Sequence, residues 1–180
     1  MRILTTVGLA LGVAFTTTPA AHTYNPPAPH RAPEVTHELV VIFFGISGTD
    51  GSPSFQKTIR DMKQSLAVAT HLQQMNLVTR GVSLDTDVEE GRRDLATLGA
   101  FDEVSLGGNW TNSSVVRYLG PTMSTGNPKG GIPQVVVLER EVTRDGASSM
   151  SIGPERELAR FIGMADIPAW VTAGTPLPKR

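Results

Sequence analysis

Residues 39–44 read Leu39-Val-Val-Ile-Phe-Phe44, an uninterrupted apolar run as long as one strand. Such a run predicts a strand that is buried on both faces, as in a sheet that helices cover on each side. A loop of small residues follows, and Ser52 with Pro53 then supply an N-cap and a proline at the first helical position. Apolar residues recur at spacings of three and four as far as Met75, which predicts a long amphipathic helix.

Strands and helices continue to alternate beyond this helix. Asp87 is placed to cap a helix that runs to Leu98. The Asp145-Gly146 pair lies between two strand-like runs, which is typical of a hairpin. The remaining pattern predicts strands over 77–84, 101–106, 132–143 and 147–152, helices around 113–119 and over 154–162, and a loop over 120–131.

The order of these elements resembles the thioredoxin fold, and two stretches carry the likeness. The first is the apolar strand, small-residue loop and long helix over 40–74. The second is Gly131-Ile-Pro-Gln-Val-Val-Val-Leu138 with the hairpin and terminal helix that follow it. The resemblance covers about residues 38–163 and implies an α/β domain with a central mixed sheet flanked by helices. It also implies a cis Pro133 beside a peptide groove near residues 46–50; a buried cis-proline without a ligand is the alternative.

The chain departs from thioredoxins in one respect that decides its chemistry. Where they carry Cys-x-x-Cys, this chain has Ser47-Gly-Thr-Asp50, and its 180 residues include no cysteine. Disulfide exchange needs a thiolate of low pKa, which serine cannot supply. The resemblance therefore implies a redox-inactive member, and we expect a protein that binds rather than catalyses.

The loop after the first strand comes close to two other motifs. Gly45-Ile-Ser-Gly-Thr49 nearly matches the nucleophile elbow of serine hydrolases, but it ends in Thr, and the downstream histidine, His71, lies within the long helix. The loop also precedes a helix start, where anions can bind, yet it lacks a lysine and carries Asp50. A tight loop in which Asp50 caps local amides explains these residues better.

The sequence gives little support to a metal site. His22, His30 and His37 lie eight and seven residues apart. A His22 N-terminus could chelate copper, but only with a second fixed imidazole. The acidic residues between Asp85 and Glu90 lie at a predicted helix start, where they favour the helix dipole. We therefore expect no metal and no cofactor.

Composition limits the classes of partner. The chain has 16 Lys and Arg against 17 Asp and Glu, a net charge of −1, so it lacks the basic surface of a nucleic-acid binder. No segment approaches the ~20 apolar residues that span a bilayer. We expect a protein partner, which is either another exported protein or a second copy of this chain.

The ends of the chain predict export and extended tails. Arg2, the apolar run from Ile3 to Phe15 and the small residues that follow have the pattern of a signal peptide over 1–21. We therefore expect a secreted or periplasmic protein. Prolines 26, 27, 29 and 33 favour an extended arm over 22–37, ahead of a domain over 38–165. Residues 166–180 are expected to form a second extended tail, with Trp170 packed back on the domain.

Two asparagines lie in glycosylation sequons. Asn109-Trp-Thr111 and Asn112-Ser-Ser114 both fit the acceptor pattern. Polar capping of a short helix explains the same residues, and we favour that interpretation.

These observations lead to a binding or assembly hypothesis. An arm that docks on the groove or sheet edge of the next subunit would make a contact that does not close on itself, which can build a filament. The alternatives are a non-thiol enzyme that uses Ser47 or Asp50 in the loop Gly45–Gly51, and a monomeric periplasmic binding protein. The residues predicted to bind are Tyr24, Pro26, Pro27 and Pro29 on the arm and Ile46, Ser47 and Pro133 at the groove.

Overall fold

The structure is a computed structural model, and it describes residues 34–48, 52–120, 131–145 and 149–178. The chain divides into two units, residues 1–30 and 31–180. The first unit lies outside the described residues, as do the predicted signal peptide and residues 22–33 of the predicted arm. Everything below concerns the second unit.

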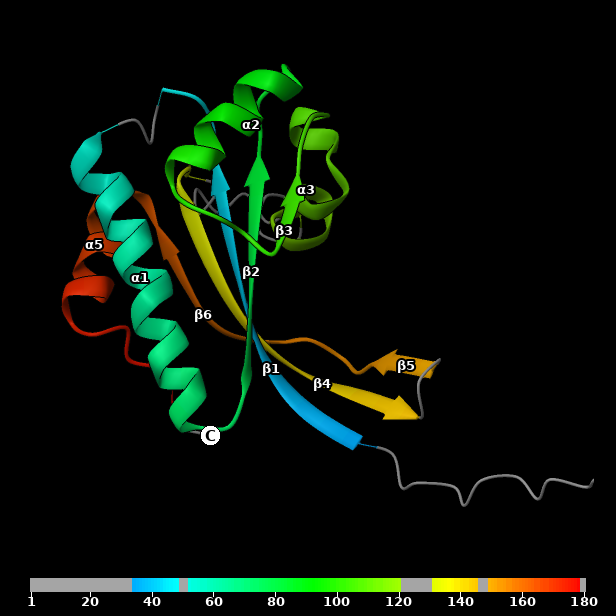
Figure 1. Cartoon of the computed structure of the whole chain (residues 1–180). Coiled ribbons are helices and arrows are strands. Elements are labelled where there is room, and N and C mark those ends of the chain that lie inside the picture. The colour runs from blue at the N-terminus through cyan, green and yellow to red at the C-terminus, as the bar shows by residue number, and fades with distance from the viewer. Residues whose placement is uncertain (1–33, 49–51, 121–130, 146–148, 179–180) are drawn as a thin grey trace, which may run out of the picture. The chain divides into compact units, whose positions relative to one another are not determined.

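Strands and helices alternate through the first two-thirds of this unit, and a group of antiparallel strands with a last helix follows (Figure 1). The strands are β1 (Glu34–Gly45), β2 (Asn76–Ser83), β3 (Glu103–Ser105), β4 (Gln134–Asp145), β5 (Ser149–Ile152) and β6 (Arg156–Ile162). The helices are α1 (Pro53–Leu72), α2 (Val88–Thr97), the 3-10 turn η1 (Asn109–Thr111), α3 (Ser113–Tyr118) and α5 (Gly163–Thr172).

The strands form one mixed sheet in the order β3-β2-β1-β4-β5, and β6 pairs with β4 beside β5. β1 and β2 are parallel, while β4 runs antiparallel to β1 from the pair Phe44–Gln134 to the pair Glu34–Arg144. The Ile132–Pro133 peptide bond that leads into β4 is cis. A β-α-β unit, an antiparallel hairpin entered through a cis-proline and a final helix make a thioredoxin-like fold, as the sequence predicts.

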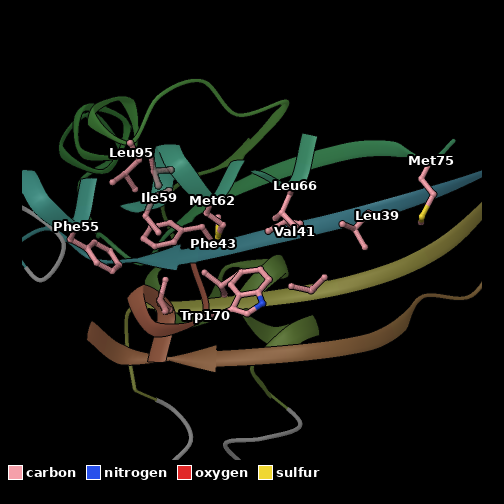
Figure 2. Close-up of a cluster of buried hydrophobic side chains, with 14 residues drawn as sticks. Leu39, Val41, Phe43, Phe55, Ile59, Met62, Leu66, Met75, Leu95 and Trp170 are labelled. Atoms are coloured by element: carbon pink, nitrogen blue, oxygen red, sulfur yellow. The ribbon is translucent and has the colours of Figure 1, made fainter. Parts of the chain in front are cut away.

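The odd-numbered and even-numbered apolar residues of β1 face opposite sides of the sheet, and each set contributes to a separate core. Leu39, Val41 and Phe43 face α1, α2 and α5, and Figure 2 shows this cluster with Trp170 of α5 against it. Val40, Ile42 and Phe44 face Val115 and Leu119 in and just after α3. The central strand is thus buried on both sides, as its uninterrupted apolar run predicts. No helix in the described ranges is long and apolar enough to cross a membrane.

Both predicted helix caps are present. The Ser52 hydroxyl accepts a hydrogen bond from the Phe55 N–H at 3.2 Å, and Pro53 is the first residue of α1. The Asp87 carboxylate accepts from the N–H groups of Glu89 and Glu90 at the start of α2. Caps of this kind are set by neighbours in sequence, which is why they can be recognised without the fold.

Three predicted segments differ in the structure. Residues 156–162, predicted as helix, form β6, because the edge of β4 from Gln134 to Glu139 is available for pairing and this long-range pairing overrides local helix preference. The predicted tail begins in α5, whose Trp170 stacks on Phe161 with ring centroids 4.1 Å apart. The last residues of the predicted arm, 34–37, belong to β1 and pair with β4. The packing of Trp170 on the domain is confirmed.

Candidate functional site

The parallel strands β1, β2 and β3 all end at one edge of the sheet, and the predicted groove residues lie at this edge. Ile46 and Ser47 follow directly after β1. Because Phe44 pairs with Gln134, the antiparallel register brings Pro133 beside the end of β1. Ile46 and Ile132 both pack against the core cluster that contains Phe44. Residues from the two ends of the domain sequence are therefore brought together here.

Asp85 holds the loop after β1 in place, a role that sequence reasoning missed. Its carboxylate accepts a hydrogen bond from the Ser47 N–H at 3.0 Å and another from the Ser83 hydroxyl at 2.6 Å. The side chain of Asp85 lies just beyond β2 and the residue is only 7% exposed. The sequence analysis assigned Asp85 to the dipole of α2, but the contacts show that it positions the loop.

Close packing of α2 supports this arrangement. Gly91 lies so near Ser83 that a Cβ on it would be 2.2 Å from the Ser83 hydroxyl oxygen. The absence of a side chain at Gly91 thus lets Ser83 reach Asp85. No sequence motif marks this glycine, because its role depends on a contact between α2 and the end of β2.

Among the described residues, none activates the Ser47 hydroxyl as a nucleophile. Its hydroxyl oxygen is buried and has no hydrogen-bond partner in the described ranges, and its N–H donates to the Asp85 carboxylate. His71 lies on the exposed side of α1, and His37 lies in β1 within 3.9 Å of Glu141. Within the part of the chain that the structure describes, neither imidazole is shown in contact with Ser47. Asp50, the other candidate in this loop, falls outside the described residues.

Hydrogen bonds on both sides of Ile132 fix the entry into β4. The Pro133 carbonyl accepts from the Gly163 N–H at 2.7 Å. The buried Gln134 donates from Nε2 to the Gly131 carbonyl at 2.9 Å and accepts from Arg160. Across the described ranges, no hydrogen bond is found for the N–H or C=O of Ile132 itself. As far as the described residues go, these two backbone groups are open to pairing with an extended ligand.

Two half-exposed apolar side chains lie at the same edge. Trp110, in the turn after β3, is 45% exposed, and Val88, at the start of α2, is 51% exposed. An aromatic ring of this size that remains open to solvent offers a large contact area at little entropic cost. Neither residue was singled out from the sequence, because exposure cannot be read from their spacing.

The two sequon asparagines differ in their surroundings. Asn112 is buried; it donates from Nδ2 to the Gly107 carbonyl at 3.0 Å and accepts from the Ser114 N–H. It therefore caps α3, which is the role that the sequence analysis favoured. Asn109 has a left-handed backbone with φ 47°, begins the 3-10 turn η1 before α3, and is partly buried.

A network of charged side chains lies on the face of the sheet that carries α3. The Glu155 carboxylate, largely buried, contacts Arg117 at 2.8 Å and Arg140 at 3.4 Å and accepts a hydrogen bond from the Tyr118 hydroxyl at 2.9 Å. Burial, together with this hydrogen bond to a carboxylate, raises the pKa of Tyr118 above its usual 10.0. Arg140 in turn pairs with Glu38 of β1 at 2.7 Å.

A cavity of about 280 Å³ adjoins this network between β3 and α3. Arg80, Tyr118 and Arg117 line part of its wall. Each guanidinium is already paired, Arg80 with Glu103 at 2.5 Å and Arg117 with Glu155. The wall therefore has little unneutralised positive charge, and we assign no ligand to it. Among the described residues, no group of three or more His, Asp or Glu side chains could hold a metal ion.

Comparison with known proteins gives two similar structures. No protein-family model matches the chain, and no curated protein matches it. A thiol-disulfide oxidoreductase from Bacteroides fragilis is similar over 77% of this chain and 78% of its own, at 16% identity and a TM-score of 0.44. A thioredoxin-like protein from Bacteroides caccae is similar over 56% of this chain and 32% of its own, at 14% identity and a TM-score of 0.31.

Proposed function

We propose that this protein is an exported, non-catalytic thioredoxin-like module that binds an extended polypeptide at the carboxyl edge of its parallel strands, and that the proline-rich arm of a second copy is this polypeptide. The fold and the absence of cysteine support a binding role over a thiol reaction. The open backbone groups of Ile132, beside a loop that Asp85 holds, supply a surface that can recognise main chain.

The direction of β1 is the observation that carries the proposal. The arm joins the domain at Glu34, and the candidate site lies beyond Gly45, at the other end of this 12-residue strand. At ~3.3 Å per residue the strand spans about 36 Å. The twelve residues 22–33 would extend only about 37 Å as polyproline II, so an arm can barely return to its own site. A neighbouring copy's site has no such limit, which favours docking between copies.

The chemistry of the arm suits this edge. A polyproline segment is already extended, so it loses little conformational entropy when it binds, and aromatic side chains are its common docking surface. Trp110 supplies an exposed indole at this edge, and Ile132 supplies a backbone donor and acceptor. Tyr24, Pro26, Pro27 and Pro29 on the arm and Ile46, Ser47 and Pro133 at the site are the residues proposed to meet.

The point where the arm joins the domain, Glu34, and the candidate site lie at opposite ends of β1, so repeated docking would be head-to-tail. Such a heterologous contact builds an open chain when the rotation between copies does not close a ring. We therefore propose a filament rather than a closed oligomer. If the chain is instead monomeric, the same edge would serve to capture the extended segment of another exported protein.

Light scattering on a sizing column tests the proposal. The protein from His22 onward should give species much larger than its own mass. The variant in which Tyr24, Pro26, Pro27 and Pro29 are all replaced by Ser should form nothing larger than a dimer, and Trp110→Ala should weaken assembly. The control variant Val68→Ser removes an exposed apolar side chain from α1 and should change nothing. Assemblies larger than a dimer that persist in the arm variant would contradict the proposal.

A further inference from the structure

The outer edge of β5 is a sheet edge with no pairing strand among the described residues. β5 pairs with β4 through Val142–Ile152 to Asp145–Ser149, and no other strand in the described part of the chain pairs with it. Its sequence, Ser149-Met-Ser-Ile152, contains no charge, proline or glycine. Proteins usually protect an exposed edge with such residues, because open N–H and C=O groups invite another strand.

The neighbouring edge strand, β6, has the protective features that β5 lacks. β6 carries Arg156, Glu157 and Arg160 within its seven residues, and its pairing with β4 is interrupted by a register shift at Val137/Leu138. Pro154, which has no N–H, separates the two edge strands. The protective features are thus concentrated on β6 and leave β5 open.

The orientation of the backbone of β5 follows from one hydrogen bond. The Gly153 N–H donates to the Glu141 carbonyl at 2.8 Å. The backbone N–H and C=O groups of the odd-numbered residues of β5 therefore point toward β4. Antiparallel ladders alternate, and Met150 and Ile152 therefore turn their N–H and C=O groups outward. Their side chains share one face of the sheet, where Met150 is 60% and Ile152 is 52% exposed.

We propose that β5 pairs with β5 of a second copy, antiparallel and about a two-fold axis at Ser151. In this register Met150 lies opposite Ile152 of the second copy, and Ile152 lies opposite Met150 of the second copy. The two pairs have outward-facing backbone groups, so four hydrogen bonds form, and the four apolar side chains make one stripe across the interface. An isologous interface requires this kind of self-complementarity, and the absence of charge on β5 leaves nothing to repel.

The small area of the proposed β5–β5 contact limits the affinity of the dimer. A pairing of four residues a side buries well under the ~1,200 Å² of a stable interface, so the dimer is weak and forms in proportion to concentration. It uses a surface separate from the arm and from the edge that carries Ser47. The inference therefore does not depend on the proposed function. If both contacts exist, β5 pairing joins head-to-tail chains side by side.

Cysteine cross-linking tests the register directly, because the chain has no cysteine of its own. In Ser151→Cys the two thiols lie in a non-hydrogen-bonded pair with Cα atoms about 4.5 Å apart, within the range that a disulfide spans. In the matched control, Ser149→Cys, the thiols are offset by four residues, about 13 Å along the strand. Both positions are exposed in the folded protein. Under mild oxidation, Ser151→Cys should run as a covalent dimer on a non-reducing gel and Ser149→Cys should not.

Charge substitution at the same position gives a second readout. Ser151→Lys and Ser151→Asp each place like charges opposite each other and should shift the concentration of half-dimerisation upward at least tenfold, while a mixture of the two variants should recover dimers. Circular dichroism checks that each variant is folded. Equal cross-linking at positions 149 and 151, or no cross-linking at 151, overturns the inference. It is also overturned if the mixture of the Lys and Asp variants does not form dimers. The arm variant keeps β5, so adding Ser151→Cys to it should give the same cross-linked dimer. This result is expected whether or not the arm docks on a second copy.

Discussion

At the scale of single residues, the carboxylate of Asp85 joins the loop after β1 to the end of β2. It accepts from the Ser47 N–H and the Ser83 hydroxyl in a site that is almost closed to water. Asp85→Ala leaves both donors without this acceptor, and a buried unsatisfied group costs about 1–3 kcal/mol. We therefore expect the free energy of unfolding, measured in urea, to fall by about 2–4 kcal/mol, and the proposed binding of a polypeptide at this edge to weaken as well.

Asp85→Asn is the matched variant for this prediction. The amide oxygen still accepts from the Ser47 N–H, and the amide nitrogen can donate to the Ser83 hydroxyl oxygen. Its loss of stability should be less than half that of Asp85→Ala. Equal losses in the two variants would show that the charge of Asp85, rather than its hydrogen bonds, holds the loop.

Tyr118 makes the stability of the protein depend on pH in the alkaline range. Burial and the hydrogen bond to Glu155 raise its pKa in the folded state above the usual 10.0. The unfolded chain therefore loses this proton first, and the stabilisation, complete below pH 10, declines as pH rises through the folded-state pKa. Urea unfolding between pH 8 and pH 11 should show this decline in the wild type, and Tyr118→Phe should lack that part of it. A variant with the same pH dependence as the wild type would contradict the assignment.

At the scale of elements, the first residues of β1 mark where the domain begins. Glu34 to His37 pair with Arg144 to Glu141, and the Thr36 hydroxyl donates to the Val142 carbonyl. A chain that starts at Glu38 loses these contacts, each worth about 0.5–1.5 kcal/mol, and should be about 2 kcal/mol less stable than one that starts at Glu34. At this chain length the melting temperature should fall by about 4–8 °C. Identical melting curves for the two chains would place the domain start at Glu38 after all.

The elements that could be predicted are those whose signals are local. Ser52 and Asp87 cap helices through their own neighbours in sequence, and the apolar run of β1 reports its burial directly. β6 could not be assigned in this way, because residues 156–162 become a strand only when the edge of β4 is beside them. Residues 166–180 were predicted to be an extended tail, yet α5 forms there with Pro168 inside it, because the burial of Ile167 and Trp170 favours the helix.

The residues of the candidate site likewise fall into those that could be predicted from the sequence and those that could not. Ile46, Ser47 and Pro133 could be placed at one edge because the resemblance to thioredoxins fixes the order of the strands. Asp85 could not, since it meets Ser47 across 38 residues of sequence and has no motif of its own. The exposure of Trp110 likewise depends on how the turn after β3 folds, which no spacing rule predicts.

At the scale of the whole molecule, the proposed head-to-tail chain would have two different ends, and each could be capped. A protein that starts at Glu34 keeps β1 and the candidate site but has no arm, so it can accept a neighbour and cannot reach one. One capping copy among ten should shorten the mean assembly to about ten subunits, because a heterologous chain ends wherever a donor is missing. Trp110→Ala weakens the site without removing it and should therefore shorten the assembly less, while Ser151→Lys should separate paired chains without shortening them. Electron microscopy of mixed samples measures these lengths, and lengths that do not respond to the armless protein would show that arm docking does not extend the chain.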